Sequence, residues 1–546
     1  MLMFLLTMAV AGLQTPPAPH DHRSQSQPAT RLLPGLGNLH HPIATGSAEG
    51  QKFFDQGLTL VYAFNHDEAI RSFKRAAELD PHSPMPHWGI ALALGPNINL
   101  DVDPEREKQA YEEAQRAVAL SASAPPKERA YVAALAKRYS DDPKADLKAL
   151  AVEYKDAMRD LARRYPDDLD AATLYAESLM DLHPWQLWAP DGTPTEGTQE
   201  IVDVLESVIK RNPMHVGANH YYIHAVEASK RPERALASAG RLETLVPKAG
   251  HLVHMPAHIY MRTGDYAGAV TRNAVAAQVD REYIAATHAG GVYPLMYFGH
   301  NLDFLASAAM MTGQFGEAAK AADELAAVAT PMLDQMPMLE PVAAKKLYVL
   351  LRFAKWQDVL DLPGAPGLDP KRPILTLLSH FGRGMAYAAL GMSESAEQER
   401  EVYRQARAAI PAEMDWGFNK APAILAIADA VLDARIAAAR HDEGAAIEAW
   451  TKAVAAQDAL KYDEPPDWFY PVRESLGAAL LNAHRPAEAE RVFRDDLARN
   501  PRNPRSLFGV WQSLLARRQR AAAWRAQAEY RRAASHADTP LTLAMF

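Results

Sequence analysis

The chain has 546 residues, of which 48% are hydrophobic and 23% charged, and its net charge is −9. This composition predicts a folded chain that is longer than one ordinary globular core requires. The charge is spread without a basic stripe, which argues against nucleic acid as the main partner. The chain has no cysteine, so disulfides and thiolate metal sites are excluded, and a metal would need nitrogen, oxygen or thioether ligands.

The first residues resemble part of an export signal. Residues 1–13 form a short apolar run, and Ala9-Val10-Ala11 offers small residues for cleavage, although no basic segment precedes the run. We therefore expect a signal peptide within 1–15, a flexible segment over 16–46, and a periplasmic or secreted mature protein; without a signal it would be cytoplasmic. No later apolar run is long enough to predict a membrane span.

Residues 50–81 carry small and aromatic residues at regular intervals. In a 34-residue frame from Gly50, positions 8, 20, 24, 27 and 32 hold Gly57, Ala69, Phe73, Ala76 and Pro81. This pattern resembles the tetratricopeptide repeat (TPR), a pair of antiparallel helices. Small residues allow the two helices to approach closely, and the proline ends the second helix.

The frame recurs along the chain. Further frames start at Val216, Gly250, Gly299, Leu377, Ile427 and Tyr470, and a degenerate, Arg-rich frame from Pro504 is typical of a capping repeat. We predict an all-α, TPR-like α-solenoid of roughly nine to ten helix pairs. Its N-terminal part would span 47–360 and its C-terminal part 374–535, with a bend at 361–373. Loop insertions are expected at 95–105, 183–197 and 282–297.

Histidines occupy repeated positions in two successive frames. His220 and His224 stand at positions 5 and 9 of one frame, and His254 and His258 stand at the same positions of the next. These spacings place the side chains on one helix face. In the TPR pattern this face lines the concave groove and does not hold the helix pair together. His251 and His300 stand at position 2 of their frames, and Asp303 at position 5.

Three interpretations fit this pattern. The first is a metal centre with His220, His224, His251, His254, His258, His300 and Asp303 as ligands or supporting groups, because imidazoles four residues apart on a helix suit one ion. Copper, iron and zinc all remain open. The second is a polar groove that binds a peptide, protein or small molecule without metal. The third is a hydrogen-bonded network between repeats.

If the centre is catalytic, Glu177 or Glu227 is the expected base, and metal-activated water or oxygen would give hydrolysis or oxidation. Trp185, Trp188, His288 and Tyr293, which lie in two of the insertions, are the expected contacts to a ligand in the groove. A periplasmic metal-handling protein without turnover, and a protein-binding scaffold without metal, are the alternatives to an enzyme.

Several segments together resemble a group of large, mostly bacterial TPR proteins. They are YAFNHDEAIRSF, HWGIALALGPNIN, LHPWQLW, GANHYYIHAVEAS and AGHLVHMPAHIYMRTGDY, within residues 50–320. The resemblance implies the fold and a shared histidine-bearing groove, and it implies no particular activity. The sequence contains no GxSxG, HExxH, P-loop or strand-linked GxGxxG motif.

Overall fold

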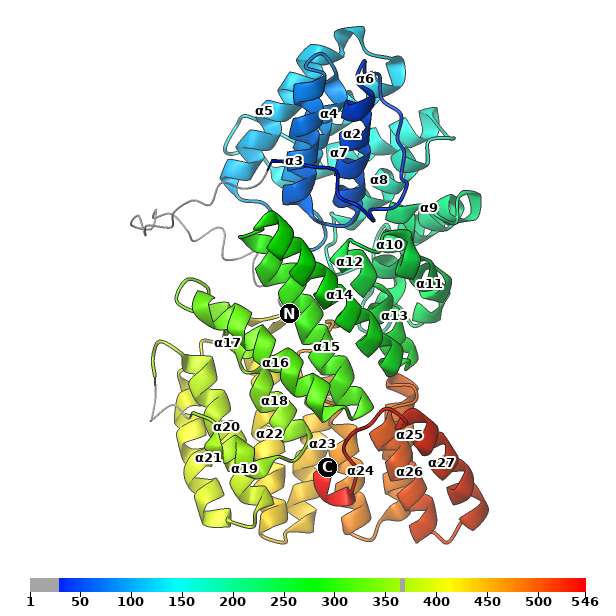
Figure 1. Cartoon of the computed structure of the whole chain (residues 1–546). Coiled ribbons are helices and arrows are strands. Elements are labelled where there is room, and N and C mark those ends of the chain that lie inside the picture. The colour runs from blue at the N-terminus through cyan, green and yellow to red at the C-terminus, as the bar shows by residue number, and fades with distance from the viewer. Residues whose placement is uncertain (1–28, 364–368) are drawn as a thin grey trace. The chain divides into compact units, whose positions relative to one another are not determined.

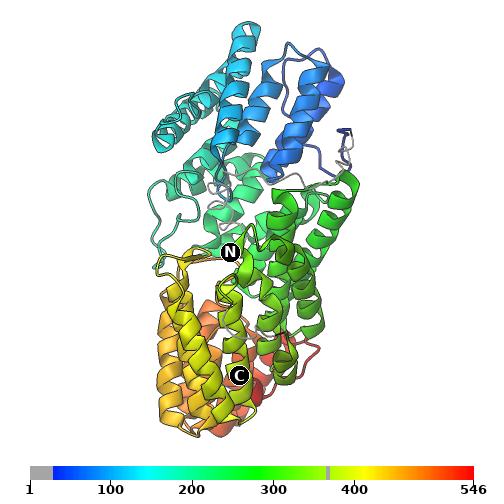
Figure 2. The same cartoon turned by 90° about the vertical axis from the view of Figure 1, so that its left-hand side faces the viewer.

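A computed structural model describes residues 29–363 and 369–546, which are helical apart from loops and one short strand pair. Helices adjacent in sequence pack against each other as pairs, as Figures 1 and 2 show, so the predicted all-α repeat architecture is confirmed. Across the described part of the chain, no helix combines the length and apolar character that crossing a membrane requires.

The helices fall into two compact units, divided within α13 (Pro256–Thr263) and α14 (Tyr266–Thr287). The N-terminal unit comprises 29–259 and Val275–Phe298. Its other elements are α2 (Ala48–Tyr62), α3 (His66–Leu79), α4 (Pro84–Leu94), α5 (Pro104–Leu120), η2 (Ser121–Ser123), α6 (Pro126–Leu135), α7 (Leu147–Arg164), α8 (Leu169–Met180), α9 (Thr198–Arg211), α10 (Val216–Glu227), η3 (Pro232–Ala235), α11 (Leu236–Leu245), α12 (Gly250–His254) and the π-helical turn η4 (Pro294–Phe298).

The C-terminal unit comprises Tyr260–Ala274 and the described residues of Gly299–Phe546. Its elements are α15 (Gly299–Thr312), α16 (Phe315–Ala329), η5 (Thr330–Met332), η6 (Pro337–Leu339), α17 (Glu340–Ala343), α18 (Lys345–Arg352), α19 (Trp356–Asp361), α20 (Pro373–Ala389), α21 (Ser393–Ala408), β1 (Asp415–Trp416), β2 (Asn419–Lys420), α22 (Ala421–Ala439), α23 (Glu443–Asp458), α24 (Arg473–Asn482), α25 (Pro486–Arg499), α26 (Pro504–Ala516), α27 (Arg520–Ala533) and η7 (Leu543–Met545). The strands pair antiparallel, with Asp415 opposite Lys420.

One packing rule operates in both units. The buried ring of Phe73 leaves no room for a Cβ at Gly57 or at Gly89, where the added atom would lie 2.5 and 2.6 Å from it. In the C-terminal unit the ring of Phe493 does the same at Gly477 and Gly509, at 2.5 and 2.3 Å. A large ring held between two glycines brings three successive helices into close contact, whereas the frame predicted this approach only within a pair.

Two predicted segments, the flexible one at 16–46 and the bend at 361–373, are described in part. Residues 29–46, predicted to be flexible, have no regular secondary structure but pack on the helices. Buried His41 bonds through Nδ1 to Asp170 Oδ2 at 2.7 Å, and the Leu33 amide donates to Gln56. These side chains supply the partners that composition alone does not reveal. The described residues of the predicted bend, 361–363 and 369–373, belong to the C-terminal unit. The predicted signal peptide at 1–15 lies outside the described residues.

Candidate metal centre

Helix α10 is the central element of the histidine cluster. It begins at Val216 because the Nδ1 atom of His215, the N-cap residue, accepts a hydrogen bond from the Ala218 amide at 3.2 Å. The helix packs on α8 and α9 and also on α2, which is distant in sequence. The close approach to α2 requires Gly217, since a Cβ there would lie 2.5 Å from the Tyr62 ring. This contact places the α2–α3 turn against the histidines of α10.

His220 has one nitrogen fixed by the backbone. Its Nδ1 lies 2.7 Å from the Tyr62 carbonyl oxygen. A carbonyl can only accept, so Nδ1 carries the proton, and in neutral His220 the Nε2 atom is a bare lone pair. Burial lowers the pKa of His220 well below its ordinary value and so keeps the ring neutral.

Glu227 fixes two more histidines. Its Oε1 lies 2.8 Å from Nδ1 of His224, and its Oε2 accepts from Nδ1 of His258. Burial alone would raise the pKa of Glu227, but the two imidazoles outweigh it and hold the pKa at about 2. Because the ionised carboxylate accepts both bonds, Nε2 of each histidine is left as a potential ligand. A carboxylate behind an imidazole is the usual support for a metal ligand.

Two pairs of ring nitrogens face each other. Nε2 of His220 lies 3.1 Å from Nε2 of His251, and Nε2 of His254 lies 2.8 Å from Nε2 of His258. In each pair one nitrogen is a lone pair, so the partner either donates a proton or shares a metal ion with it. Two nitrogen ligands at about 2.0–2.1 Å from a tetrahedral ion lie about 3.3 Å apart, so the His220–His251 spacing fits a shared ion as well as a hydrogen bond.

Three histidines meet the distance requirement of a metal site. One ring nitrogen from each of His220, His224 and His251 lies within 4.8 Å of the others, and all three residues are buried. Nε2 of His224 has no hydrogen-bond partner among the described residues. The donor set is neutral nitrogen with a carboxylate behind it, which suits zinc, copper or iron. The residues therefore fit a transition metal ion.

Phe64 forms one wall of this set. Its ring centroid lies 4.7 Å from that of His220, 5.4 Å from that of His251 and 6.0 Å from that of His224. Its φ of 54° is a left-handed backbone conformation that a bulky residue rarely adopts. Phe64 was not among the predicted site residues, and only its position in YAFNHDEA, just after a predicted helix, offered a signal.

The second histidine segment is broken where one continuous helix was expected. Pro256 divides it into α12 and α13, because proline cannot donate the helical hydrogen bond. His254 and His258 nevertheless remain neighbours, with ring centroids 4.7 Å apart. At the start of α12, Gly250 leaves room for Asp280, whose Oδ1 would lie 1.8 Å from a Cβ at that position.

The insertion at 282–297 supports α12 from another side. Tyr293, predicted as a ligand contact, is buried, and its hydroxyl donates to Asp280 Oδ1 at 2.8 Å. Tyr297 lies in the π-helical turn η4, which packs on α12, and its ring centroid is 5.1 Å from that of His251. Tyr293 and Tyr297 thus position the centre, whereas His288 is exposed and takes no part in it.

The insertion at 183–197 packs on the cluster. The ring of half-buried Trp185 stands edge-on to His224, with centroids 5.7 Å apart. Trp188 Nε1 donates to the Ala225 carbonyl at 2.8 Å, which fixes the insertion to α10. The five histidines from His220 to His258 are no more than 5% exposed. They are therefore buried in the repeat, whereas an open groove was expected.

The two predicted bases occupy different environments. Both oxygens of Glu227 accept imidazole protons, so this carboxylate orients the rings of His224 and His258 and has no oxygen left to act as a base. Buried Glu177 lies beside Asp181, close enough to share a proton, and Arg138 Nη2 bonds to Asp181 at 2.7 Å. Burial and the charge of Asp181 raise the pKa of Glu177 well above its ordinary value, and burial raises the pKa of Asp181 to about 6.

Two predicted ligands belong to the C-terminal unit. His300 is buried on α15, with its ring centroid 5.5 Å from that of Phe304. Asp303 is buried too, and its Oδ1 forms an ion pair with Lys345. The positive charge beside Asp303 favours a structural role over a ligand role.

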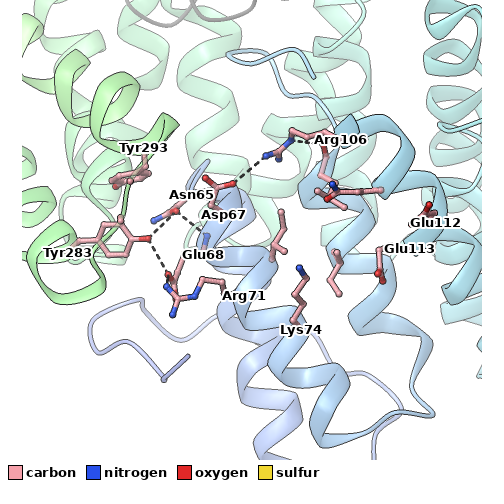
Figure 3. A pocket seen from close by; sticks show the side chains of 16 residues that line it. Asn65, Asp67, Glu68, Arg71, Lys74, Arg106, Glu112, Glu113, Tyr283 and Tyr293 are labelled. Carbon is pink, nitrogen blue, oxygen red and sulfur yellow. Dashed lines mark hydrogen bonds and ion pairs between the residues drawn. The ribbon is translucent and has the colours of Figure 1, made fainter. Parts of the chain in front are cut away.

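A pocket of about 360 Å³ also lies in the N-terminal unit (Figure 3). Asn65, next to Phe64, lines it, together with charged residues of α3 and α5 and the rings of Tyr283 and Tyr293. The Tyr283 hydroxyl donates to Glu68 Oε2 at 3.3 Å. Both charge signs line this pocket.

Comparisons with known proteins give structural likenesses only. No family model matches the chain, and no curated protein does. A human IFIT1 dimer with m7Gppp-AAAA is 12% identical over 90% of this chain and 92% of that one, with a TM-score of 0.32. Naa15/Naa10 bound to HypK-THB is 13% identical over 91% of this chain and 85% of that one, with a TM-score of 0.26. The P58(IPK) TPR domain is 12% identical over 87% of this chain and 99% of that one, with a TM-score of 0.23. At these values the likenesses carry no inference about ligand or activity.

Proposed function

We propose that this TPR-like protein binds a transition metal ion through His220, His224 and His251. The observation that carries the proposal is that Tyr62 and Glu227 fix the protons of His220 and His224 on Nδ1. Their Nε2 atoms are then bare nitrogen ligands in a buried site. A network built only for stability would also give Nε2 of His224 a hydrogen-bond partner, and among the described residues it has none.

The neighbouring pair, His254 and His258, extends this centre. Glu227 joins the two sets, since it bonds to His224 and to His258. Such a pair supports a second ion beside the first, or a second layer of imidazoles around one ion. Zinc, copper or iron would supply a Lewis acid there, and copper or iron would add electron transfer. Oxidation and hydrolysis are the reaction classes open to such a centre, and export to the periplasm remains part of the proposal.

The test is elemental analysis of protein purified without a histidine tag and reconstituted with each metal. We expect about one or two bound equivalents in the wild type and loss of binding in His220→Ala/His251→Ala. The matched control is His41→Ala, which removes another buried histidine whose Nδ1 already bonds to Asp170. Circular dichroism checks the helical content of each variant. Absence of metal in reconstituted wild type, or equal loss in the control, contradicts the proposal.

A second candidate function is peptide binding in the 360 Å³ pocket. Its mixed charges and two tyrosine rings suit a short peptide that carries both a basic and an acidic group. Screening a peptide library by fluorescence polarisation against wild type and Tyr283→Ala tests this. Ligands that bind both proteins equally would place the binding elsewhere.

A further inference from the structure

A small cavity adjoins the candidate metal centre. It has a volume of about 20 Å³ and is lined by Ile98, Met180, Trp185, Leu187 and Ala228, together with His224 and Glu227. A cavity needs about 10–15 Å³ to hold one water molecule, so this one admits a ligand of one or two heavy atoms. Peptides, sugars and most organic substrates are too large for it.

The lining also indicates the polarity of the ligand. Ile98, Met180 and Leu187 are buried and apolar. The polar side chains at the cavity are His224 and Glu227, and both Glu227 oxygens accept imidazole protons. An apolar cavity of this kind tends to stay dry and to favour a neutral, apolar guest. Nε2 of His224, which has no hydrogen-bond partner among the described residues, is the atom through which a bound ion would reach the guest.

We infer that the centre takes a neutral diatomic ligand of the dioxygen class at its open coordination position. This inference rests on the proposed metal site and deepens it, because it favours oxygen chemistry over hydrolysis. A hydrolytic centre would place its water beside a free base, and neither oxygen of Glu227 is available for that role. The insertion at 183–197 then acts as a hydrophobic cover, with Trp185 and Leu187 facing the guest.

The test uses protein loaded anaerobically with ferrous iron, with nitric oxide as the probe and the iron–nitrosyl electron paramagnetic resonance signal as the readout. Met180→Phe fills the cavity, and Met158→Phe is the matched control, since Met158 is a buried methionine of α7 that does not line it. We expect nitric oxide to bind the wild type and Met158→Phe, and to bind Met180→Phe at least about tenfold more weakly. Iron content is measured in every sample.

A second variant keeps the test independent of folding defects. Met180→Ala enlarges the cavity, so it should gain binding of ethyl isocyanide, which the wild type excludes. Full iron content without a nitrosyl signal, or equal binding by Met180→Phe and Met158→Phe, overturns the inference and leaves the metal site standing. Failure of the wild type to retain any metal overturns the proposed function itself.

Discussion

Two histidine clusters lie in the N-terminal unit, and they differ in what their nitrogens face. In one, Asp170 accepts from His41 at 2.7 Å and from Tyr62 at 2.6 Å, and it pairs with His215 at 3.3 Å. In the other, ring nitrogens of His220 and His251 face each other at 3.1 Å. In the first cluster, a carboxylate accepts from each donor, whereas in the second cluster two imidazole nitrogens face each other.

This difference shows why residue type alone does not define a metal site. His41, Asp168 and Asp170 also lie within ligand distance of one another. However, Asp168 caps α8 and bonds to Tyr131, while Asp170 holds three donors, so both carboxylates are already used. In the second cluster, Nε2 of His224 has no hydrogen-bond partner among the described residues, so a nitrogen lone pair remains available there.

Removing Asp170 should have the largest effect on stability. Asp170→Ala leaves Tyr62, His41 and His215 without their common acceptor, and bonds to a charged group contribute about 1.5–3 kcal/mol each. We expect the free energy of unfolding to fall by more than about 3 kcal/mol, with metal content per folded molecule unchanged. Urea titration and elemental analysis measure the two quantities. A loss of metal in the folded variant would mean that the first cluster also binds an ion.

The corresponding change in the second cluster should affect metal binding. Glu227→Gln keeps the size of the side chain but replaces one acceptor oxygen with a donor, so His224 or His258 loses its orientation. Changing such a supporting group typically costs 10–100-fold in metal affinity, or about 1.4–2.7 kcal/mol. Competition with a chelator gives the affinity. An unchanged value would remove Glu227 from the centre.

The stability of the N-terminal unit should depend on pH through the buried carboxyl pair of Glu177 and Asp181. The folded-state pKa values of Glu177 and Asp181 are raised, so the folded chain holds protons that the unfolded chain releases, and stability falls as pH rises through about 6. Glu177→Gln removes the part of this loss that comes from Glu177. Relative to the wild type, the variant should gain stability as the pH rises above the ordinary pKa of a glutamate, about 4.3. Thermal melts in matched buffers measure the difference, and a difference independent of pH would show that the pair shares no proton.

The smallest expected effect concerns Asp303. Because Lys345 pairs with its carboxylate, Asp303→Asn should leave the metal content at the wild-type level. Elemental analysis beside the Glu227→Gln sample makes the contrast direct. A drop in metal with Asp303→Asn would restore this residue to the ligand set predicted from the repeat frame.

Much of the fold was predictable because the repeat expresses local rules. Gly57 and Phe73 in one frame, and Gly477 and Phe493 in another, are spaced so that ring and glycine meet across a helix pair, and the structure confirms both contacts. The packing of 29–46 was not predictable, since its partners lie far along the chain. His41, for example, bonds to Asp170, 129 residues away.

For the site, the sequence by itself determined the helical frame and the spacing of His220, His224, His254 and His258, because helix periodicity fixes which residues share a face. Only the tertiary structure decided that these side chains are buried and which nitrogens keep a proton. That decision depends on acceptors from other elements: the Tyr62 carbonyl of α2 for His220, and Glu227 of α10 for His258 on α13. The repeat pattern predicted which residues are candidate ligands. Long-range packing oriented the ring nitrogens of some of these histidines and left others, such as His288, exposed to solvent.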